Sequence, residues 1–520
     1  MTAVFEKRLS ALSASDRNAA AGALTGIEKE SLRVGTDGFI ASTGHPIALG
    51  SSLTNRFITT DFSEALLEFV TPAYDAPEQA LTCLHDIHQF TMAQLNDELL
   101  WNASMPCLIG NDQSIPLARY GNSNVATMKT VYRRGLSYRY GRAMQAIAGI
   151  HFNFSLAEQF WPVFQQCTED GQPLEAARDT AYMALARNFR RVGWIVLYLF
   201  GASPVMCKSF LGDRTSALAE FDSDTLFEPY ATSLRMSDLG YNSNAQSSLR
   251  ISLNSVQQYV EDLTAAIMTS HAAYERIGVQ VGGQWRQLNT SILQIENEYY
   301  NTIRPKQVAR SGERPTLALQ RGGVQYVEIR SLDINPFSPV GLTLEQMHYM
   351  QALLVYCLLL DSPPIDEAEL AEHAANHALV AHSGRAPALE LRRRGSSVLL
   401  QDWAREIHEG VSAVAAWLSQ EDSRYQSAVA AITPLIEDAD ATPSARVLRE
   451  MRDSGLPYHA YAMQQARDHA AYFAALPPMP EQLARAMHRE ASESLQKQQR
   501  VEAEDTGSFE DYLADYFRLD

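Results

Sequence analysis

Carboxylates set within apolar, strand-like stretches are the feature that most constrains the fold of this chain. In LTGIEKESLRV, residues 24–34, Glu28 and Glu30 stand two residues apart between apolar flanks. Side chains of an extended chain alternate between two faces, so both carboxylates share a face with Leu32. A single pair of this kind is most simply a solvated edge strand, so the pattern is informative only if it recurs.

The pattern recurs in four further stretches, which are TTDFSEALLEFVTP, AGIHFNFSL, SILQIENEYY and VQYVEIRSLDINPF. In each stretch, acids or a histidine share one strand face, and bulky apolar groups occupy the other. The polar residues concerned are Asp61, Glu68, His151, Asn153, Gln294, Glu296, Glu298, Glu328 and Arg330. Together these stretches predict a sheet with an apolar back and an acidic front.

The order of the elements indicates the fold class. Alternation predicts strands at 26–34, 56–71, 146–156, 286–300 and 324–332, and helical spacing predicts helices at 1–21, 76–99 and 175–200. Because the strands do not alternate regularly with helices, we expect an α+β fold on an antiparallel sheet. Beyond 342 the pattern is helical, broken by a polar stretch at 382–397. We therefore expect a catalytic part, 1–342, and a helical part, 343–520, within one large domain.

A cluster of carboxylates repels itself and is costly to desolvate, so its members must be spread in solvent, protonated or held by cations, and divalent cations solve this problem best. Mg²⁺ prefers oxygen ligands, and one imidazole such as His151 is compatible with Mg²⁺ or Mn²⁺. The alternatives are a satisfied core histidine at 151 and a solvated strand residue at Glu296. His85 and His88 stand at helical i, i+3 spacing without a partner set, which favours a polar helix face over a metal site.

Arginines and tyrosines accompany the acids, as in TVYRRGLSYRYGR and YYNTIRPK. The formal net charge of −18 argues against broad binding to nucleic acid or to anionic membranes. Recognition of carboxylates and phosphates fits these cations better. The sequence has neither a P-loop nor a GxGxxG motif, so a bound nucleotide is expected to be held by metals and arginines.

The cysteines and the apolar runs indicate the compartment. Five cysteines are widely spaced without a CxxC pair, which favours a reducing compartment over a disulfide framework. The start of the chain lacks the apolar core of a signal peptide, and the run at 193–202 is too short to cross a bilayer. We expect a cytoplasmic protein that binds no membrane.

Ordered blocks through roughly 22–342 give the sequence a family likeness. GIEKESLRV, FITTDFSEALLEFVTP, YRRGLSYRYG, GIHFNFSL, PYATSLRMSDLGY, LQIENEYYNTIRPK and RGGVQYVEIRSLDINPFSP resemble the proteobacterial type of glutamate–cysteine ligase, with weaker likeness in the helical remainder. The resemblance implies a curved antiparallel sheet funnel of the glutamine synthetase-like carboxylate–amine ligase type. Its inner face would bind metals and substrates.

The resemblance also implies roles for particular residues. The positions that ligate Mg²⁺ would be Glu28, Glu30, Asp61, Glu68, His151 and Glu328. The catalytic contacts to phosphate would be Arg330 and Arg133, with Arg304 and Lys306 on the nucleotide. The substrate contacts would be Tyr132, Arg235, Tyr241 and Tyr300, with Phe62 and Leu136 as walls of the cysteine side-chain pocket.

The implied activity is ATP-dependent ligation of the L-glutamate γ-carboxylate to the amine of L-cysteine through a γ-glutamyl phosphate, the first step of glutathione biosynthesis. We expect a monomer, with feedback inhibition by glutathione as an option. The alternatives are a related ligase with another amine acceptor, a metal-dependent phosphohydrolase, and a non-catalytic glutathione- or glutamate-binding protein. A phosphohydrolase leaves the Tyr and Arg set without a purpose, and a sensor would be expected to lose metal ligands.

Overall fold

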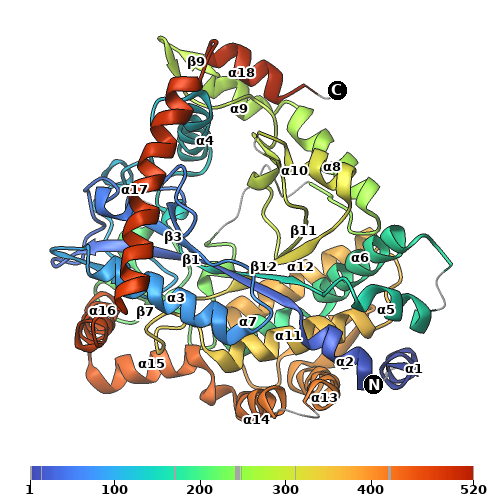
Figure 1. Ribbon diagram of the computed structural model, residues 1–520. Helices are drawn as coiled ribbons and strands as arrows, with labels where there is room; N and C mark the ends of the chain where they lie inside the picture. The colour runs from blue at the N-terminus through green and yellow to red at the C-terminus, as the bar shows by residue number, and fades with distance from the viewer. Residues whose placement is uncertain are drawn as a thin grey trace.

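A seven-stranded antiparallel sheet lies at the centre of the protein (Figure 1). The computed structural model describes residues 3–12, 14–168, 171–212, 214–240, 246, 249–310, 312–419 and 423–518. The strand order is β11 (Ile303–Lys306), β12 (Tyr326–Leu332), β5 (Ile150–Ser155), β1 (Leu24–Gly35), β3 (Leu66–Val70) and β2 (Ile58–Thr60), and β4 (Glu98–Trp101) also pairs with β1. The mixed helical and antiparallel architecture expected from the sequence is confirmed.

The register of the sheet decides which side chains share a face. Glu28 pairs with His151, Glu30 with Glu68, and Glu328 with Asn153. Directly paired residues of antiparallel strands point to the same side, so these polar side chains form one face, called here the front.

A β-bulge keeps the end of β12 in phase with this front. Ile329 pairs with Phe152 while Leu332 pairs with Ile150, so β12 holds one residue more than β5 across this interval. The extra residue returns Leu332 to the apolar back of the sheet after Arg330. Bulges redirect side chains in this way at the edges of binding sites.

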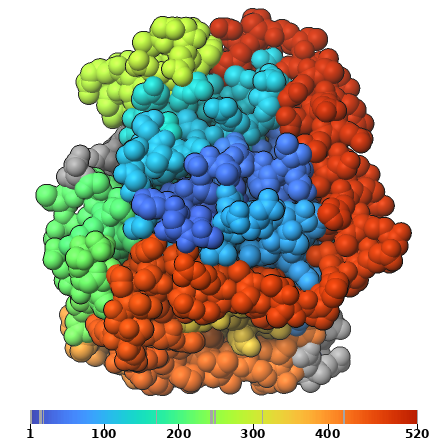
Figure 2. All heavy atoms as spheres, turned by 90° about the vertical axis from the view of Figure 1, so that its left-hand side faces the viewer, coloured from blue at the N-terminus to red at the C-terminus, as the bar shows by residue number. Residues whose placement is uncertain are grey.

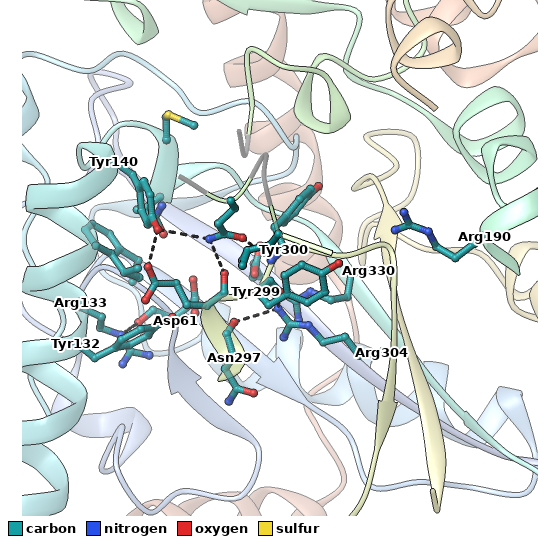
Figure 3. A pocket seen from close by; sticks show the side chains of 18 residues that line it. Asp61, Tyr132, Arg133, Tyr140, Arg190, Asn297, Tyr299, Tyr300, Arg304 and Arg330 are labelled. Carbon is teal, nitrogen blue, oxygen red and sulfur yellow. Dashed lines mark hydrogen bonds between the residues drawn. The ribbon is translucent and has the colours of Figure 1, made fainter. Parts of the chain in front are cut away.

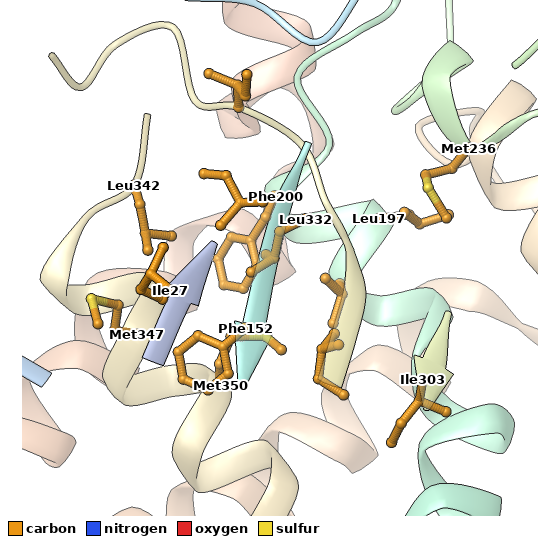
Figure 4. Close-up of a cluster of buried hydrophobic side chains, with 14 of the residues drawn as sticks. Ile27, Phe152, Leu197, Phe200, Met236, Ile303, Leu332, Leu342, Met347 and Met350 are labelled. Atoms are coloured by element: carbon orange, nitrogen blue, oxygen red, sulfur yellow. The ribbon is translucent and has the colours of Figure 1, made fainter. Parts of the chain in front are cut away.

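The back of the sheet packs against helices. Figure 4 shows Ile27, Phe152 and Leu332 beside Phe200 of α7 (Trp194–Phe200) and Met347 of α11 (Leu344–Leu359). α11 is buried from Gln346 to Leu359, as expected of a helix that has apolar side chains on nearly all sides. A capping box between Thr343 and Gln346 fixes where α11 begins.

The back is less apolar than the alternation predicts. Lys29 is 1% exposed there, and its ammonium donates to Ser31 Oγ at 2.7 Å and lies 3.2 Å from His88 Nε2. His88 belongs to α3 (Pro77–Met92) and stacks on Phe473. The prediction of a polar helix face is therefore wrong for His88, which is buried because it faces the sheet.

The other helices surround this centre. They are α1 (Ala3–Ala11), α2 (Ala14–Ala21), α4 (Asn124–Tyr140), α5 (Phe160–Thr168), α6 (Leu174–Val192), α8 (Val256–Met268), α9 (Ala272–Ile277), α10 (Pro315–Gly322), α12 (Glu367–Ser383), α13 (Leu400–Leu418), α14 (Arg424–Glu437), α15 (Pro443–Ser454), α16 (Tyr458–Ala475), α17 (Glu481–Glu504) and α18 (Phe509–Tyr516). Among the described residues, none of these helices combines the length and the apolar character that crossing a membrane requires.

The C-terminal helices brace the N-terminal part of the chain. α17 runs along one side of the molecule, where its red surface borders the blue N-terminal segments (Figure 2). Glu490 of α17 bonds Arg56 at 2.6 Å, and Ser494 Oγ accepts from the Ser51 amide at 2.9 Å. α18 packs on α4, so the C-terminal end of the chain supports the helix that carries Tyr132 and Arg133.

Several predicted elements differ from the structure. The stretch 56–71 is two strands, β2 and β3, joined by a turn that contains Asp61, and helix 1–21 is α1 and α2. The helix at 175–200 is interrupted at Gly193, where a Cβ would lie 2.5 Å from the Phe189 carbonyl oxygen. The polar loop at 382–397 contains a hairpin of β13 (Glu390–Arg393) and β14 (Ser396–Leu399). Short strands β6 (Val205–Cys207), β7 (Ala219–Glu220) and β8 (Thr225–Phe227), and β9 (Gln280–Val281) and β10 (Gln284–Trp285), form two further small sheets.

The strand predicted at 286–300 is wrong. β10 ends at Trp285, before this range begins, and the range itself holds the short 3-10 helix η6 (Glu296–Glu298). Glu296 and Glu298 therefore do not share a strand face. Glu296 is bonded to Arg314 at 3.0 Å and Thr316 at 2.6 Å, so it is buried rather than solvated. Tertiary ion pairs override the local alternation here.

Candidate active site

Acids of β1 and β3 and a histidine of β5 converge on the front of the sheet. Glu28, Glu68 and His151 each offer a ligand atom, and the three atoms lie within 4.8 Å of one another. His151 Nδ1 is 3.0 Å from Glu28 Oε2, and its Nε2 is 3.8 Å from Glu30 Oε1. Carboxylate oxygens with one imidazole form a donor set that suits a divalent cation.

Glu30 is held in place by the start of β5. Its Oε2 accepts from the Gly149 amide at 2.6 Å. A Cβ at Gly149 would lie 1.9 Å from Arg235 Nη2, so only glycine leaves room for that guanidinium. The carboxylate and the arginine can therefore both approach the same backbone segment.

Glu328 lies on the same front among three cations. Its carboxylate is 3.1 Å from Arg330 Nη1, 3.6 Å from Lys306 Nζ and 3.7 Å from Arg304 Nη1. Burial by itself raises its pKa, but the charges of Lys306 and Arg330 bring the pKa well below the usual value. Burial opposes the charge on Arg330 too, yet Glu328 and Glu30 raise the pKa of that guanidinium, so it stays charged.

The acids on β1 and β3 are less well compensated. Burial raises the pKa of Glu68 well above its usual value, and the charges of Asp61, Glu28 and Glu30 raise it further. The pKa of Glu30 is raised by burial and by Asp61. For Glu28, burial is outweighed by the hydrogen bond and charge of His151, and its pKa is lowered. This crowding of like charges is what a bound cation would relieve.

Two adjoining cavities open over this cluster. The first, of about 280 Å³, is lined by Phe62, Leu136, Tyr132 and Tyr300 among others (Figure 3). The second, of about 290 Å³, is lined by cations and by five of the predicted metal ligands, which are Glu28, Asp61, Glu68, His151 and Glu328. Both cavities share Asp61, Tyr132, Arg133, Asn297, Arg304 and Arg330. The site thus combines a cavity of amino-acid size with a second cavity that is lined by carboxylates and by basic side chains.

Most residues predicted from the sequence line these cavities. Arg133, Arg304 and Arg330 line both cavities, Glu30 and Phe62 only the first, and Lys306 only the second. All six residues predicted from the sequence as metal ligands line one or the other cavity, and they come from four strands and a turn, namely Glu28, Glu30, Asp61, Glu68, His151 and Glu328. The sequence prediction that distant acids share one face is confirmed by the strand register.

One predicted substrate contact, Arg235, is placed differently. Arg235 does not line either cavity; its Nη2 donates to the Arg330 carbonyl at 2.9 Å, and its Nη1 lies 3.6 Å from Asp333. Its guanidinium is buried beneath the end of β12, where it supports the backbone of Arg330. Tyr241 lies outside the residues that the structure describes.

The sequence analysis placed Glu298 on the acidic front of the sheet but gave it no role at the site, and it missed several other wall residues. Glu298 is buried in the first cavity wall, where it accepts from Tyr140 OH at 2.5 Å, from Arg139 at 3.1 Å and from the Gln294 amide at 2.7 Å. The other residues missed include Asn297, Gln145, Arg190, Tyr140 and Lys129. Lys129 could have been found, because it precedes Arg133 by four residues on α4 and so faces the same side.

The comparisons with known proteins agree on one family. A family described as glutamate-cysteine ligase matches residues 9–380. The glutamate–cysteine ligase of Pseudomonas paraeruginosa (strain DSM 24068 / PA7) is 48% identical over 498 residues, which cover 95% of this chain and 94% of that protein. That of Azotobacter vinelandii (strain DJ / ATCC BAA-1303) is 46% identical over 522 residues, covering 99% of this chain and 98% of that protein.

Solved structures resemble most of the chain. A crystal structure of glutamate–cysteine ligase from Francisella tularensis in complex with AMP has a TM-score of 0.90 at 38% identity, covering 95% of this chain and 97% of that one. A bifunctional glutathione synthetase from Pasteurella multocida has a TM-score of 0.71 at 24% identity, covering 88% of this chain and 54% of that one. The second likeness concerns the fold alone.

Proposed function

Because the chain belongs to the glutamate–cysteine ligase family, we propose that it carries out that ligation at the two-cavity site on the front of the sheet. The enzyme joins the γ-carboxylate of L-glutamate to the amine of L-cysteine with ATP as co-substrate, which is the first step of glutathione biosynthesis. The observation that carries the assignment to this site is the convergence of Glu28, Glu68 and His151 beside a cavity of amino-acid size.

The reaction needs an activated carboxylate. A free carboxylate is a poor acyl donor, so the γ-phosphoryl group of ATP is first transferred to a γ-carboxylate oxygen of glutamate. A bond between that oxygen and phosphorus forms, the bond from phosphorus to the β,γ-bridging oxygen breaks, and ADP leaves with the electron pair. The neutral amine of cysteine then attacks the acyl carbon, inorganic phosphate leaves, and the surplus amine proton passes to solvent.

The residues present fit a divalent cation, which we take to be Mg²⁺, with Mn²⁺ as a substitute. Glu28, Glu68 and His151 would hold it, with Glu30, Asp61 and Glu328 as further ligands of one or more ions. When bound, such an ion neutralises charge on the phosphate oxygens. The raised pKa values of Glu30 and Glu68 in its absence support this assignment.

Phosphoryl transfer depends on charge neutralisation and alignment, which the arginines supply. Arg330 donates to the Glu328 carboxylate at 3.1 Å and lines both cavities. We therefore assign it to binding the phosphoryl group that is transferred. Arg133 lies on the α4 side of the site, across from Arg304 and Arg330 (Figure 3). Its guanidinium donates to the Asp61 carbonyl and stacks 4.7 Å above the Tyr120 ring, which fixes its direction. We assign Arg304 and Lys306 to the nucleotide phosphates.

The first cavity suits the amino acids. Burial raises the pKa of Tyr132 and of Tyr300, so both phenols stay protonated as hydrogen-bond donors to substrate carboxylates. Phe62 and Leu136 give an apolar wall for the short side chain of cysteine. We assign Tyr241 to the same amino-acid contacts and give Arg235 a positioning role through the Arg330 backbone.

Further proposals concern the wider setting of the enzyme. We propose that the curved sheet is a funnel of the glutamine synthetase-like carboxylate–amine ligase type, with 1–342 as the catalytic part and 343–520 as a helical part of the same domain. We also propose a cytoplasmic monomer, in line with the five free cysteines, and inhibition by glutathione at the amino-acid cavity.

The decisive assay measures phosphate release and dipeptide with Mg²⁺, ATP and glutamate, in the presence of cysteine, of 2-aminobutyrate, or of no amine. We expect phosphate and γ-glutamylcysteine in equal amounts, and slower reaction with 2-aminobutyrate. Phosphate without an amine-dependent product would indicate a hydrolase. Nucleotide binding without turnover would indicate a sensor, and a strong preference for another amine would indicate the related ligase.

A further inference from the structure

Lys129 of α4 lies in the second cavity as a cation without an acidic partner. No carboxylate oxygen among the described residues lies within the 4.0 Å of an ion pair from its ammonium. Its ammonium instead lies 4.6 Å from the centre of the Tyr120 ring. Lys129 is half-buried, and an ammonium that faces a cavity with an aromatic ring in place of an acidic partner is poorly compensated in the ligand-free protein.

A second cation beside it makes the position less favourable still. Arg133, one helical turn later, stacks on the same ring at 4.7 Å, and its Nη1 donates to the Lys129 carbonyl at 3.0 Å. Burial, and next the charge of Arg133, lower the pKa of Lys129 to about 8. Two like charges are therefore held side by side on one wall, and an anion between them and the opposite wall would relieve the repulsion.

The cations on the opposite wall of the cavity have an acidic partner. Arg330, Arg304 and Lys306 each lie within 3.7 Å of the Glu328 carboxylate, so their charges are compensated before any ligand binds. Glu68 and Asp61 act on Lys129 only from beyond ion-pair distance. In this part of the site, the cation that lacks an acidic partner is therefore Lys129 on α4.

We propose that Lys129 is a further catalytic residue, whose ammonium binds oxygens of the phosphoryl group as it passes from ATP to the glutamate carboxylate. This inference rests on the proposed function and adds to it the α4 wall as a phosphate-binding surface. Lys129 donates hydrogen bonds and keeps its proton throughout, since the leaving ADP takes the electron pair of the broken bond. It stabilises negative charge on the oxygens from the side opposite Arg330.

The rival explanation is a structural counter-ion to Glu68 and Asp61. In that case the loss of Lys129 would change the affinity for divalent cations and would affect all nucleotides alike. A contact to the terminal phosphoryl group predicts a different result, because only a nucleotide with a γ-phosphate would lose binding. Nucleotides of different length therefore separate the two roles.

The test compares Lys129→Met, Lys129→Arg and a control, Lys497→Met, which changes an exposed lysine of α17. Calorimetry with Mg²⁺ measures the affinity for AMP, ADP and the β,γ-imido analogue of ATP, alongside Mg²⁺ affinity, kcat, KM and thermal unfolding. For Lys129→Met we expect AMP affinity within about twofold of the parent, imido-analogue affinity about tenfold weaker, and kcat about 100-fold lower. Lys129→Arg should recover part of both losses, and the control should match the parent.

Equal weakening for all three nucleotides, or changed Mg²⁺ affinity alone, would overturn the proposal in favour of the counter-ion. Unchanged binding and kcat would overturn it outright. If Lys129→Met does not fold, Lys129→Gln carries the same comparison. Failure of the proposed function has a separate signature, because the parent protein itself would then form no γ-glutamyl dipeptide whatever the variants bind.

Discussion

Glu30 on β1 and Glu68 on β3 stand directly opposite each other in the sheet register, so a buried and a half-buried carboxylate share one face. Directly opposed like charges destabilise an antiparallel pair. The fold therefore holds in its centre an arrangement that is unfavourable without a cation. This relationship suggests that function rather than stability places acids here, and it leads to the first test.

Glu68→Gln should lower activity about 100-fold or more while stabilising the metal-free fold. The pKa of Glu68 is raised in the folded state, so the native protein binds this proton more tightly than the unfolded chain does. Stability is therefore lost as the pH rises from the usual carboxyl range through the folded pKa. In buffers with chelator at pH 8, the variant should unfold at a higher temperature than the parent. A lower melting temperature with chelator would contradict this account, and Glu493→Gln on the exposed side of α17 is the matched control.

Glu328→Gln should reduce kcat by about 100-fold or more, because Arg330, Arg304 and Lys306 would lose their shared partner. The same change leaves three cations crowded, so the metal-free protein should also lose stability, in contrast to Glu68→Gln. Steady-state kinetics and thermal unfolding measure both effects. Near-normal turnover would remove Glu328 from the site.

Glu298→Ala should destabilise the protein by about 3–5 kcal/mol, because it leaves the buried guanidinium of Arg139 without its carboxylate. The same carboxylate joins α4 to the segment that carries Asn297 and Tyr300, so KM for the amino acids should rise more than KM for ATP. Chemical denaturation and KM values for each substrate check these two outcomes. Equal changes in every KM would indicate general loosening, and Glu261→Ala on α8 serves as the exposed control.

His382 should make stability depend on pH. Its Nδ1 lies 2.8 Å from Glu228 and its Nε2 lies 2.7 Å from Asp238, and the bond to Glu228 is the main cause of a raised pKa. A raised folded pKa gives stability that is complete below the usual histidine pKa of about 6.5 and is lost as the pH rises through the folded pKa. His382→Gln should therefore cost about 1 kcal/mol at pH 5.5, since the pair is half-exposed, and less at pH 9. Urea titrations at both pH values measure this difference, and an equal loss at both would show that the charge is irrelevant.

Much of the site could be predicted from the sequence, because strand alternation is a local property. The face shared by Glu28 and Glu30, and the polar face of His151 and Asn153, follow from the geometry of an extended chain. The stretch at 286–300 shows where this reasoning fails. Its alternation predicted a strand, but Arg314 and Arg139 draw Glu296 and Glu298 into separate buried ion pairs.

The sequence by itself determined the polar and apolar faces of the main strands, the helical character beyond 342 and, through the family likeness, the set of acids that belong together. Only the tertiary structure decided that Glu30 meets Glu68, that a bulge returns Leu332 to the apolar back beyond Arg330, and that Lys29 and His88 are buried behind the site. The physical reason is that the direction of a side chain depends on its own backbone. The group that it meets depends on which distant strands and helices pack together, and on the charges that they bring.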